Sequence, residues 1–168
     1  MKRLLLYTNI YGEMVVDPNS SQLREAYPLK KVDILVYGFS LIRKELRQTP
    51  KTKKYLGRNL RIVLLSFYDE FVGGHTLKVD ETVLYNLARQ YYFAYKNIGG
   101  HRSEEELFKD YLIVACASQN GMDIVVSNDD SSMLSGHSLE AYHRVNKELK
   151  LKQPQFIDYD EFKALLLG

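Results

Sequence analysis

Short runs of apolar residues recur along the chain and predict the strands of a sheet. Most positions in each run are apolar in succession rather than alternately, which is typical of strands buried on both faces. The four runs are Arg3–Tyr7, Val32–Tyr37, Asp123–Ser127 and Pro154–Ile157. We therefore expect a parallel sheet that is covered on both faces.

Between these runs, apolar residues recur at the three- and four-residue spacing of helices. Ser103 and Glu106 form a capping box, and Gly121 is placed to end the helix that they open. The expected helices run from Leu41 to Arg47 with Ser40 as N-cap, from Asp80 to Gly99, from Ser103 to Gly121, from Leu139 to Leu149, and from Asp158 to Leu167. The run Arg61–Phe67 fits a strand or a buried helix. Alternating strands and helices predict an α/β fold.

Composition narrows the class of protein. With 168 residues, 45% of them hydrophobic and 26% charged, the chain fits one globular domain spanning residues 1–168, without repeats or linkers. The net charge is only +2, so an argument for a nucleic-acid partner must rest on local clusters. A single cysteine, Cys116, fits a reducing compartment, and no apolar run is long enough for a membrane span. We expect a cytoplasmic protein without a membrane partner.

Carboxylates stand where the pattern calls for apolar residues. Glu45 and Asp110 share the apolar faces of their helices, and Asp129 and Asp130 follow the Asp123–Ser127 strand directly. The carboxyl ends of parallel strands are where ligands bind in such sheets. Clustered acids are tolerated when they hold a hard cation such as Mg²⁺ or Mn²⁺, which suits phosphodiester hydrolysis. Taken singly, each acid also fits a salt-bridged side chain, a helix cap or an Asx-turn.

The order of motifs resembles a PIN domain, the nuclease fold of many toxin-type ribonucleases and RNA-processing enzymes. A first strand that ends in Asp-Thr-Asn is matched by Leu4–Asn9, and a Ser-x-x-x-x-Glu-Leu helix by Ser40–Leu46. An Asp-x-x-Ile-x-x-x-Ala helix is matched by Asp110–Ala117, and Thr-x-Asp after a strand by Ser127–Asp129. A late Pro-x-x-Ile strand and helix is similar to the segment from Pro154 to Phe162. The resemblance thus covers almost the whole chain.

This resemblance implies a Rossmann-like, three-layer α/β/α sandwich with a central parallel sheet. It further implies a divalent-metal-dependent endoribonuclease that cuts single-stranded RNA, with Glu45, Asp110 and Asp129 as ligands of Mg²⁺ or Mn²⁺. Asp130 and Asn9 would assist catalysis. It also implies a toxin of a toxin–antitoxin pair, with an antitoxin protein that covers the site, and a homodimer.

Tyr7 departs from the family pattern, because it occupies the position of the first family Asp. A phenol has a pKa of about 10, so it is neutral at neutral pH and a poor ligand for Mg²⁺. Three interpretations stay open. The protein is a degenerate member that binds RNA or protein without cutting, or another acid such as Asp130 substitutes, or position 7 is altered in this sequence.

A basic cluster follows Glu45 and suggests where RNA binds. Eight basic residues and a single acid occupy positions 43–61, and clusters of this kind neutralise phosphates of single-stranded or structured RNA. Its core consists of Arg43, Lys44, Arg47, Lys51, Lys53 and Lys54. A solvated helix end is the alternative. Aromatic residues crowd the Asp80–Gly99 helix and favour a core and an interface over base stacking.

A phosphoryl-receiver domain is the third class that we considered, because it also gathers acids at a doubly wound sheet. Receiver domains carry their paired acids after the first strand, whereas Asp129 and Asp130 come late in this chain. The sequence therefore favours the PIN-type nuclease, followed by its catalytically silent form.

Overall fold

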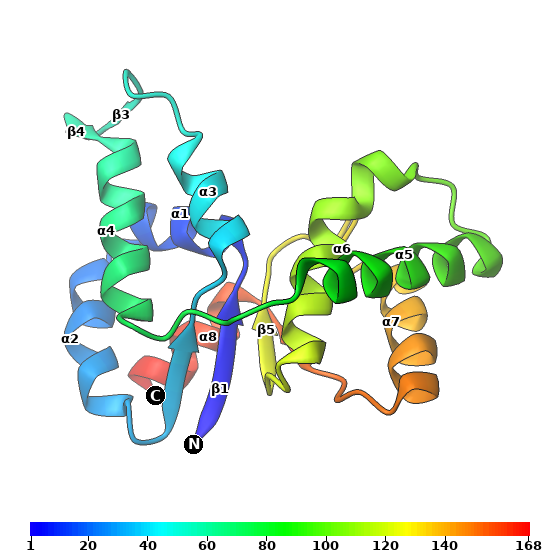
Figure 1. Ribbon diagram of the computed structural model, residues 1–168. Coiled ribbons are helices and arrows are strands. Elements are labelled where there is room, and N and C mark those ends of the chain that lie inside the picture. The colour runs from blue at the N-terminus through cyan, green and yellow to red at the C-terminus, as the bar shows by residue number, and fades with distance from the viewer.

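The computed structural model describes residues 1–168 and has a four-stranded parallel sheet at its centre (Figure 1). The strands are β1 (Lys2–Leu6), β2 (Ile34–Tyr37), β5 (Ile124–Val126) and β6 (Gln155–Ile157). Their order is β2-β1-β5-β6, with Leu4 of β1 opposite Val36 on one side and Ile124 on the other. All four predicted strands are confirmed, as is the parallel sheet.

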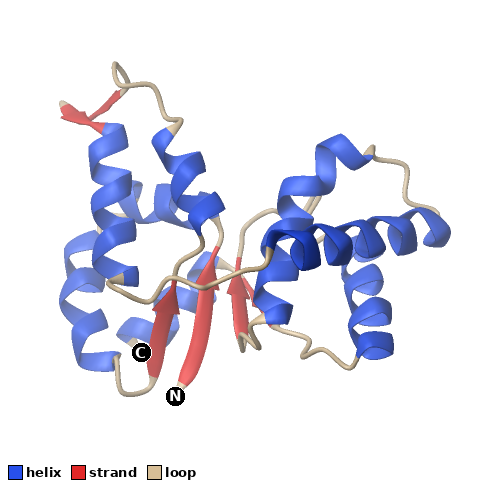
Figure 2. Ribbon diagram, viewed as in Figure 1, coloured by secondary structure: helices blue, strands red, loops and turns tan.

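Eight helices flank this sheet, which confirms the predicted α/β fold (Figure 2). They are α1 (Thr8–Val16), α2 (Ser20–Lys30), α3 (Ser40–Arg47), α4 (Leu60–Val72), α5 (Glu81–Ile98), α6 (Glu104–Gln119), α7 (Gly136–Leu149) and α8 (Tyr159–Leu167). Two further strands, β3 (Lys54–Tyr55) and β4 (Arg58–Asn59), form a hairpin at the start of α4. None of these helices combines the length and apolar character that a membrane span requires.

The ends of the long helices follow the predicted capping signals. The Asp80 carboxylate accepts the backbone N–H of Val83 at the start of α5. Ser103 and Glu106 form the capping box of α6. Gly121 follows the α6 C-cap at φ 61°, and the N–H groups of Gly121 and Met122 reach back to the carbonyls of Ser118 and Ala117 in a Schellman motif.

The structure corrects one local prediction, decides one that was left open, and adds two helices. Ser40 is not the N-cap of α3, because the helix already includes it and Phe39 takes the cap position without a side-chain hydrogen bond. The ambiguous run Arg61–Phe67 is helical and belongs to α4. Helices α1 and α2 were not predicted, because Gly12 and Pro28 lie within them and disfavour helix.

The chain forms two groups of helices beside the sheet (Figure 1). Helices α1 to α4 with the hairpin lie on one side, α5 to α7 lie on the other, and residues 73–80 cross between them. Gly38 holds this crossing segment by two backbone hydrogen bonds of 2.8 Å. Its N–H donates to the carbonyl of His75, and its carbonyl accepts the N–H of Leu77. A Cβ at Gly38 would lie 2.3 Å from the Tyr68 hydroxyl, so a larger residue does not fit there.

A single cluster of 45 buried hydrophobic residues forms the core. It includes Tyr91 and Tyr95 of α5, which accounts for part of the predicted aromatic crowding, whereas Tyr85 and Phe93 on the same helix stay exposed. The core fixes the carboxyl ends of β1, β2 and β5, and the candidate site lies at these ends.

Candidate functional site

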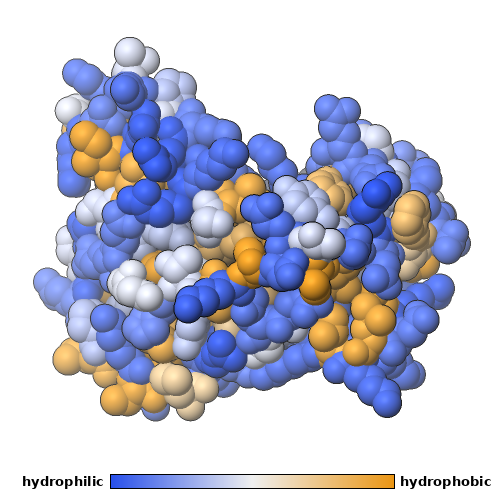
Figure 3. All heavy atoms as spheres, in the orientation of Figure 1, coloured by the Kyte–Doolittle hydropathy of each residue, from blue (hydrophilic) through white to orange (hydrophobic).

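The predicted site residues stand just beyond the carboxyl ends of three neighbouring strands. Tyr7 follows β1 directly, Glu45 lies on α3 after β2, and Asp129 lies in the loop after β5. Asp110 comes from the middle of α6. Seen from the side in Figure 3, the outline of the molecule is hollowed between the two groups of helices, above these strand ends. We call Tyr7, Glu45, Asp110 and Asp129 with their bonded neighbours the acid pocket.

Tyr7 bonds directly to an acid of this pocket. Its hydroxyl donates to Oδ1 of Asp110 at 2.5 Å, across 103 positions of sequence. Asp110 is only 6% exposed, so this contact lies in a largely dry environment. Burial and the neighbouring carboxylates raise the pKa of the Tyr7 phenol well above its usual value. The phenol therefore remains protonated and acts as a donor toward Asp110.

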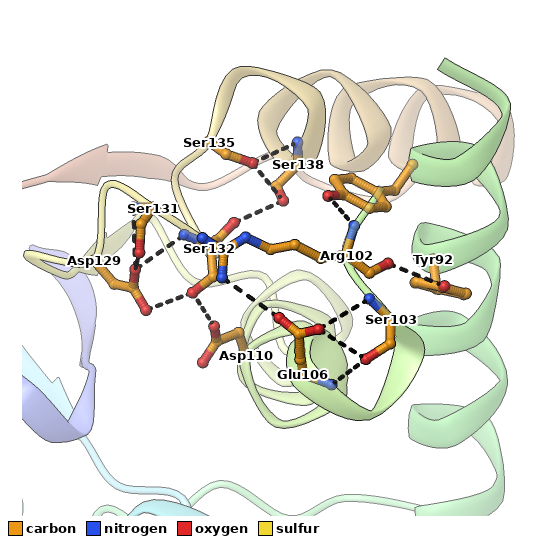
Figure 4. Close-up of polar contacts among 11 residues, drawn as sticks. Tyr92, Arg102, Ser103, Glu106, Asp110, Asp129, Ser131, Ser132, Ser135 and Ser138 are labelled. Carbon is orange, nitrogen blue, oxygen red and sulfur yellow. Dashed lines mark hydrogen bonds and ion pairs between the residues drawn. The ribbon is translucent and has the colours of Figure 1, made fainter. Parts of the chain in front are cut away.

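The hydroxyl of Ser132 contacts two carboxylates of the acid pocket, those of Asp110 and Asp129. Ser132 Oγ lies 2.6 Å from Oδ2 of Asp110 and 2.6 Å from Oδ2 of Asp129 (Figure 4). A hydroxyl carries one proton, so it can donate to only one of these carboxylates. The second short contact is a hydrogen bond only when one of the two acids is itself protonated and donates to Ser132.

The surroundings of the two acids decide which of them holds that proton. Burial raises the pKa of Asp110, although the Ser132 and Tyr7 bonds and the Arg102 charge oppose this rise. Burial also acts on Asp129, but the bonds from Ser132 and Ser131 together lower the pKa of its carboxyl. Asp110 is therefore the more basic of the pair and the better holder of the shared proton.

The loop after β5 supplies most of the donors that fix Asp129. Oδ1 of Asp129 accepts the backbone N–H groups of Ser131 and Ser132 and the hydroxyl of Ser131, at 3.0 to 3.2 Å. Ser138 at the start of α7 donates to the Ser132 carbonyl at 2.7 Å (Figure 4). The loop thus holds Asp129 by an Asx-type arrangement and is itself tied to α7.

The opposite side of the acid pocket is less complete. Glu45 accepts the Thr8 hydroxyl at its Oε2, 2.8 Å away, but its Oε1 is buried without a hydrogen-bond partner. Oδ1 of Asn9 is likewise buried and unpartnered. Burial raises the pKa of Glu45, while the Thr8 bond and the Lys109 charge act to lower it. Two oxygens on this side thus lack the donors that buried acceptors require.

In this arrangement, Asp110 does not offer the free oxygens that the divalent metal implied by the family resemblance would need. Both carboxylate oxygens of Asp110 already contact hydroxyls, and one of these belongs to Tyr7. No group of three or more His, Cys, Asp or Glu side chains lies close enough to hold a metal ion. The assignment of Glu45, Asp110 and Asp129 as metal ligands therefore stays a prediction.

Asp130 does not join the other acids. It is exposed and lines a separate cavity of about 410 Å³ together with Glu13, Asn128, Asp158 and Asp160. The Asp129 side chain is bonded within its own loop, whereas no bond holds Asp130 toward Asp110. Nothing in the arrangement favours Asp130 as a substitute for the missing family acid.

The predicted basic cluster forms a groove beside the acid pocket. A cavity of about 410 Å³ is lined entirely by polar residues of α3, its C-terminal end and α4, which we call the basic groove: Ser40, Arg43, Lys44, Arg47, Gln48 and Arg61. Arg43 makes two bonds of 3.0 Å with Asp69, so its charge is already paired. Lys51, Lys53 and Lys54 are exposed and lead into the β3–β4 hairpin.

Sequence reasoning missed the hydroxyl donors that organise the acid pocket. Ser132 and Thr8 hold the acids, and Arg102 makes an ion pair of 3.7 Å with Glu106 while its charge acts on Asp110. The run of serines between Ser127 and Ser138 was the available signal, since serines next to aspartates in a loop form side-chain turns.

No protein-family model matches the sequence, and neither does any curated protein. Solved structures do resemble it in fold. A structure of VapBC2 from Rickettsia felis, bound to a DNA fragment from their promoter, has a chain that is 12% identical, with a TM-score of 0.56 over 93% of this chain and 98% of that one. A structure of FitAB bound to a DNA fragment gives 19% identity and a TM-score of 0.57, over 93% and 94%.

A structure of VapBC-1 from nontypeable Haemophilus influenzae gives 13% identity and a TM-score of 0.55, over 94% of this chain and 98% of that one. At these identities the likeness concerns the fold, and it confirms the PIN-like fold that the motif order predicts.

Proposed function

We propose that this protein is a PIN-type RNA-binding domain of the toxin–antitoxin class in which Tyr7 has silenced metal-dependent cleavage. The observation that carries the proposal is the 2.5 Å bond from the Tyr7 hydroxyl to Asp110. A neutral phenol stands where the family resemblance expects an anionic metal ligand, and it engages the oxygen of Asp110 that a metal would need. RNA binding would persist, because the basic surface is separate from Tyr7.

The basic groove supports RNA as the ligand. Lys44, Arg47 and Arg61 line it without an acidic partner in an ion pair, and Lys51, Lys53 and Lys54 extend the positive surface toward the hairpin. Phosphate binding by such a surface is weakened by salt, because bound RNA releases its counterions. Helix α3 carries both the groove and Glu45, so RNA in the groove would pass the acid pocket.

A second candidate function is the metal-dependent endoribonuclease, with Glu45, Asp110 and Asp129 as ligands of Mg²⁺ or Mn²⁺ and with Asp130 and Asn9 assisting. The unpartnered oxygens of Glu45 and Asn9 favour it, because buried acceptors without donors suit a cation. It ranks second because Tyr7 and Ser132 occupy both oxygens of Asp110.

Both candidate functions imply the same partners, because both place the protein in the toxin–antitoxin class. We propose an antitoxin protein that covers the acid pocket and a second copy of the chain, with the exposed Phe93 of α5 available for contact. We also propose that residues 1–168 act as one PIN-like domain in the cytoplasm.

The experiment compares the parent protein with Tyr7→Asp on labelled single-stranded RNA, with Mn²⁺, with Mg²⁺ and with EDTA. We expect RNA binding by both forms and cleavage only by Tyr7→Asp with metal, at least about 100-fold above the parent, which is the order that one well-placed charged group contributes. Tyr7→Asn is the matched control, because it removes the phenol without adding an acid. Metal-dependent cleavage by the parent would establish the second candidate instead, and absence of RNA binding would refute both.

A further inference from the structure

An apolar cavity of about 200 Å³ lies next to the basic groove, outside the acid pocket. Phe39, Leu84, Tyr85 and Leu112 provide apolar walls, and the cavity lies where the connection between α4 and α5 meets α3. Orange, apolar side chains gather near the middle of the face drawn in Figure 3, over this connection. The volume is below the roughly 300 Å³ at which pockets for drug-sized ligands begin, so it suits a single flat ring system.

The apolar cavity and the basic groove share a wall. Ser40 and Lys44 line both of them, so an apolar slot and a cationic groove lie on either side of the same turn of α3. This is the layout of a nucleotide, in which a flat base lies one sugar away from charged phosphates. An acidic peptide would match both only if it carried an aromatic side chain beside its acids, whereas every nucleotide carries a flat base and a phosphate.

Tyr85 gives the cavity a fixed aromatic surface. Its ring stacks on Phe108 with the centroids 5.4 Å apart and an interplanar angle of 21°, while 44% of the residue stays exposed. Unpaired bases stack on aromatic side chains of this kind, and each stacked base strengthens binding. Stacking alone accepts every base, so it does not select a sequence.

Glu81 adds a means of selection, because it is the single acidic residue that lines the apolar cavity. An ionised carboxylate accepts hydrogen bonds and donates none. Guanine presents two adjacent donors on its Watson–Crick edge, N1–H and the N2 amino group, whereas adenine, cytosine and uracil place acceptors beside their donors. Two parallel bonds to Glu81 are therefore available to guanine alone.

We infer that the apolar cavity binds an unpaired guanine of single-stranded RNA, stacked on Tyr85 and bonded to Glu81, while the flanking phosphates lie in the basic groove. The inference rests on the proposed RNA-binding function and names the base that the same surface selects. Lys44, on the shared wall, would bind the phosphate next to that guanine.

The test measures fluorescence anisotropy with labelled single-stranded RNA in EDTA at fixed salt. The probes are a decamer of uridines and the same decamer with one central guanosine, inosine or adenosine. We expect the guanosine decamer to bind about tenfold more tightly than the uridine one, as a bidentate pair contributes about 1–3 kcal/mol of discrimination. Inosine lacks the N2 amino group, so its decamer should bind with intermediate affinity.

Variants separate this inference from the proposed function. Glu81→Gln is expected to reduce the guanosine preference to about twofold or less. Tyr85→Ala should weaken all four decamers and Tyr85→Phe should not, because stacking on an aromatic ring accepts every base. Phe93→Ala is the matched control, since Phe93 is an exposed aromatic of the same helix that does not line the cavity. Arg47→Ala should weaken all four decamers alike.

Each remaining outcome has one meaning. Equal affinity for guanosine and uridine decamers, with both weakened by Arg47→Ala, would overturn the guanine site and leave the RNA-binding function intact. An apolar side chain of a protein partner would then be the better occupant of the cavity. No binding of any decamer would overturn the RNA-binding function and the guanine site together.

Discussion

The two sides of the acid pocket differ in how well the protein satisfies their oxygens. On the serine side, each carboxylate oxygen of Asp110 and Asp129 contacts a hydroxyl or an N–H group. On the α3 side, Glu45 keeps one buried oxygen without a partner, and so does Asn9 of α1. The serine side is complete by itself, whereas the α3 side still lacks donors or a cation.

Tyr7 accounts for part of this difference between the two sides. Its hydroxyl supplies a donor to Asp110 in place of the acid that the family pattern calls for. A carboxylate at position 7 would instead add a third acid beside Asp110 and Asp129, and their repulsion would have to be relieved by a cation or by further protonation. The serine side is thus a closed hydrogen-bonded network, whereas the α3 side is not.

The strongest way to break this comparison is Asp129→Asn. The variant keeps one oxygen that can accept the N–H groups of Ser131 and Ser132, but it removes the negative charge and places an NH₂ group against the Ser132 hydroxyl. We expect a loss of about 3 kcal/mol in the free energy of unfolding at pH 7, because several hydrogen bonds to a charged acceptor would become weaker bonds to a neutral one. Urea unfolding of the parent and the variant in EDTA measures this loss.

The pH dependence of that loss is fixed by the sign of the pKa shift. The folded-state pKa of Asp129 is lowered, so its contribution is present above the usual value and disappears as the pH falls through the folded-state pKa. The parent and Asp129→Asn should therefore converge in acid. Asp130→Asn is the control, since Asp130 is exposed, and a loss as large as that of Asp129→Asn would contradict the comparison.

A smaller effect is expected from Ser132→Ala, which removes the hydroxyl between Asp110 and Asp129. Oδ2 of each acid would lose its contact with the hydroxyl, and we expect a loss of about 2 kcal/mol in unfolding free energy. Ser131→Ala is the matched control, because Ser131 is exposed and Asp129 keeps the backbone N–H groups. It should change the unfolding free energy by less than about 0.5 kcal/mol. Equal losses in the two variants would contradict the bridging role of Ser132.

Much of the fold was predictable from the sequence, because consecutive apolar positions identify buried strands whatever surrounds them. Helices α1 and α2 were not, since Gly12 and Pro28 oppose helix locally and only tertiary packing overrides that preference. Helical spacing predicted that Glu45 and Asp110 lie on the apolar faces of their helices. It did not predict their hydroxyl partners, because Tyr7 and Asp110 are 103 positions apart and no local pattern records their contact.

Asp110→Asn sharpens the comparison by testing where the shared proton lies. An asparagine in the orientation of a protonated Asp110 accepts from Tyr7, donates to Ser132 and lets Ser132 donate to Asp129, so every bond of the serine side is satisfied. The folded-state pKa of Asp110 is raised, so the stability that its proton brings is present in acid and is lost as the pH rises through the folded-state pKa.

We therefore expect Asp110→Asn to unfold with about 1 kcal/mol more free energy than the parent at pH 8, and with an equal free energy near pH 3. Urea unfolding across this pH range in EDTA measures the difference. A variant that is less stable at pH 8 would mean that Asp110 is ionised and that the proton lies elsewhere in the network.

The smallest effect is expected on the α3 side, from Glu45→Gln. Burial raises the pKa of Glu45, and one of its oxygens has no donor, so neutralising the group removes a charge that the protein does not satisfy. An amide can still accept the Thr8 hydroxyl, and we expect a gain of about 0.5 kcal/mol in unfolding free energy at pH 8, limited by solvent screening. Because the folded-state pKa of Glu45 is raised, the gain should vanish in acid, where Glu45 is protonated in the parent.

Unfolding of Thr8→Val, with and without Glu45→Gln, measures how far the hydrogen bond from Thr8 to Glu45 depends on the charge of Glu45. A loss of stability in Glu45→Gln would mean that the α3 side already satisfies its carboxylate, and the contrast between the two sides would disappear.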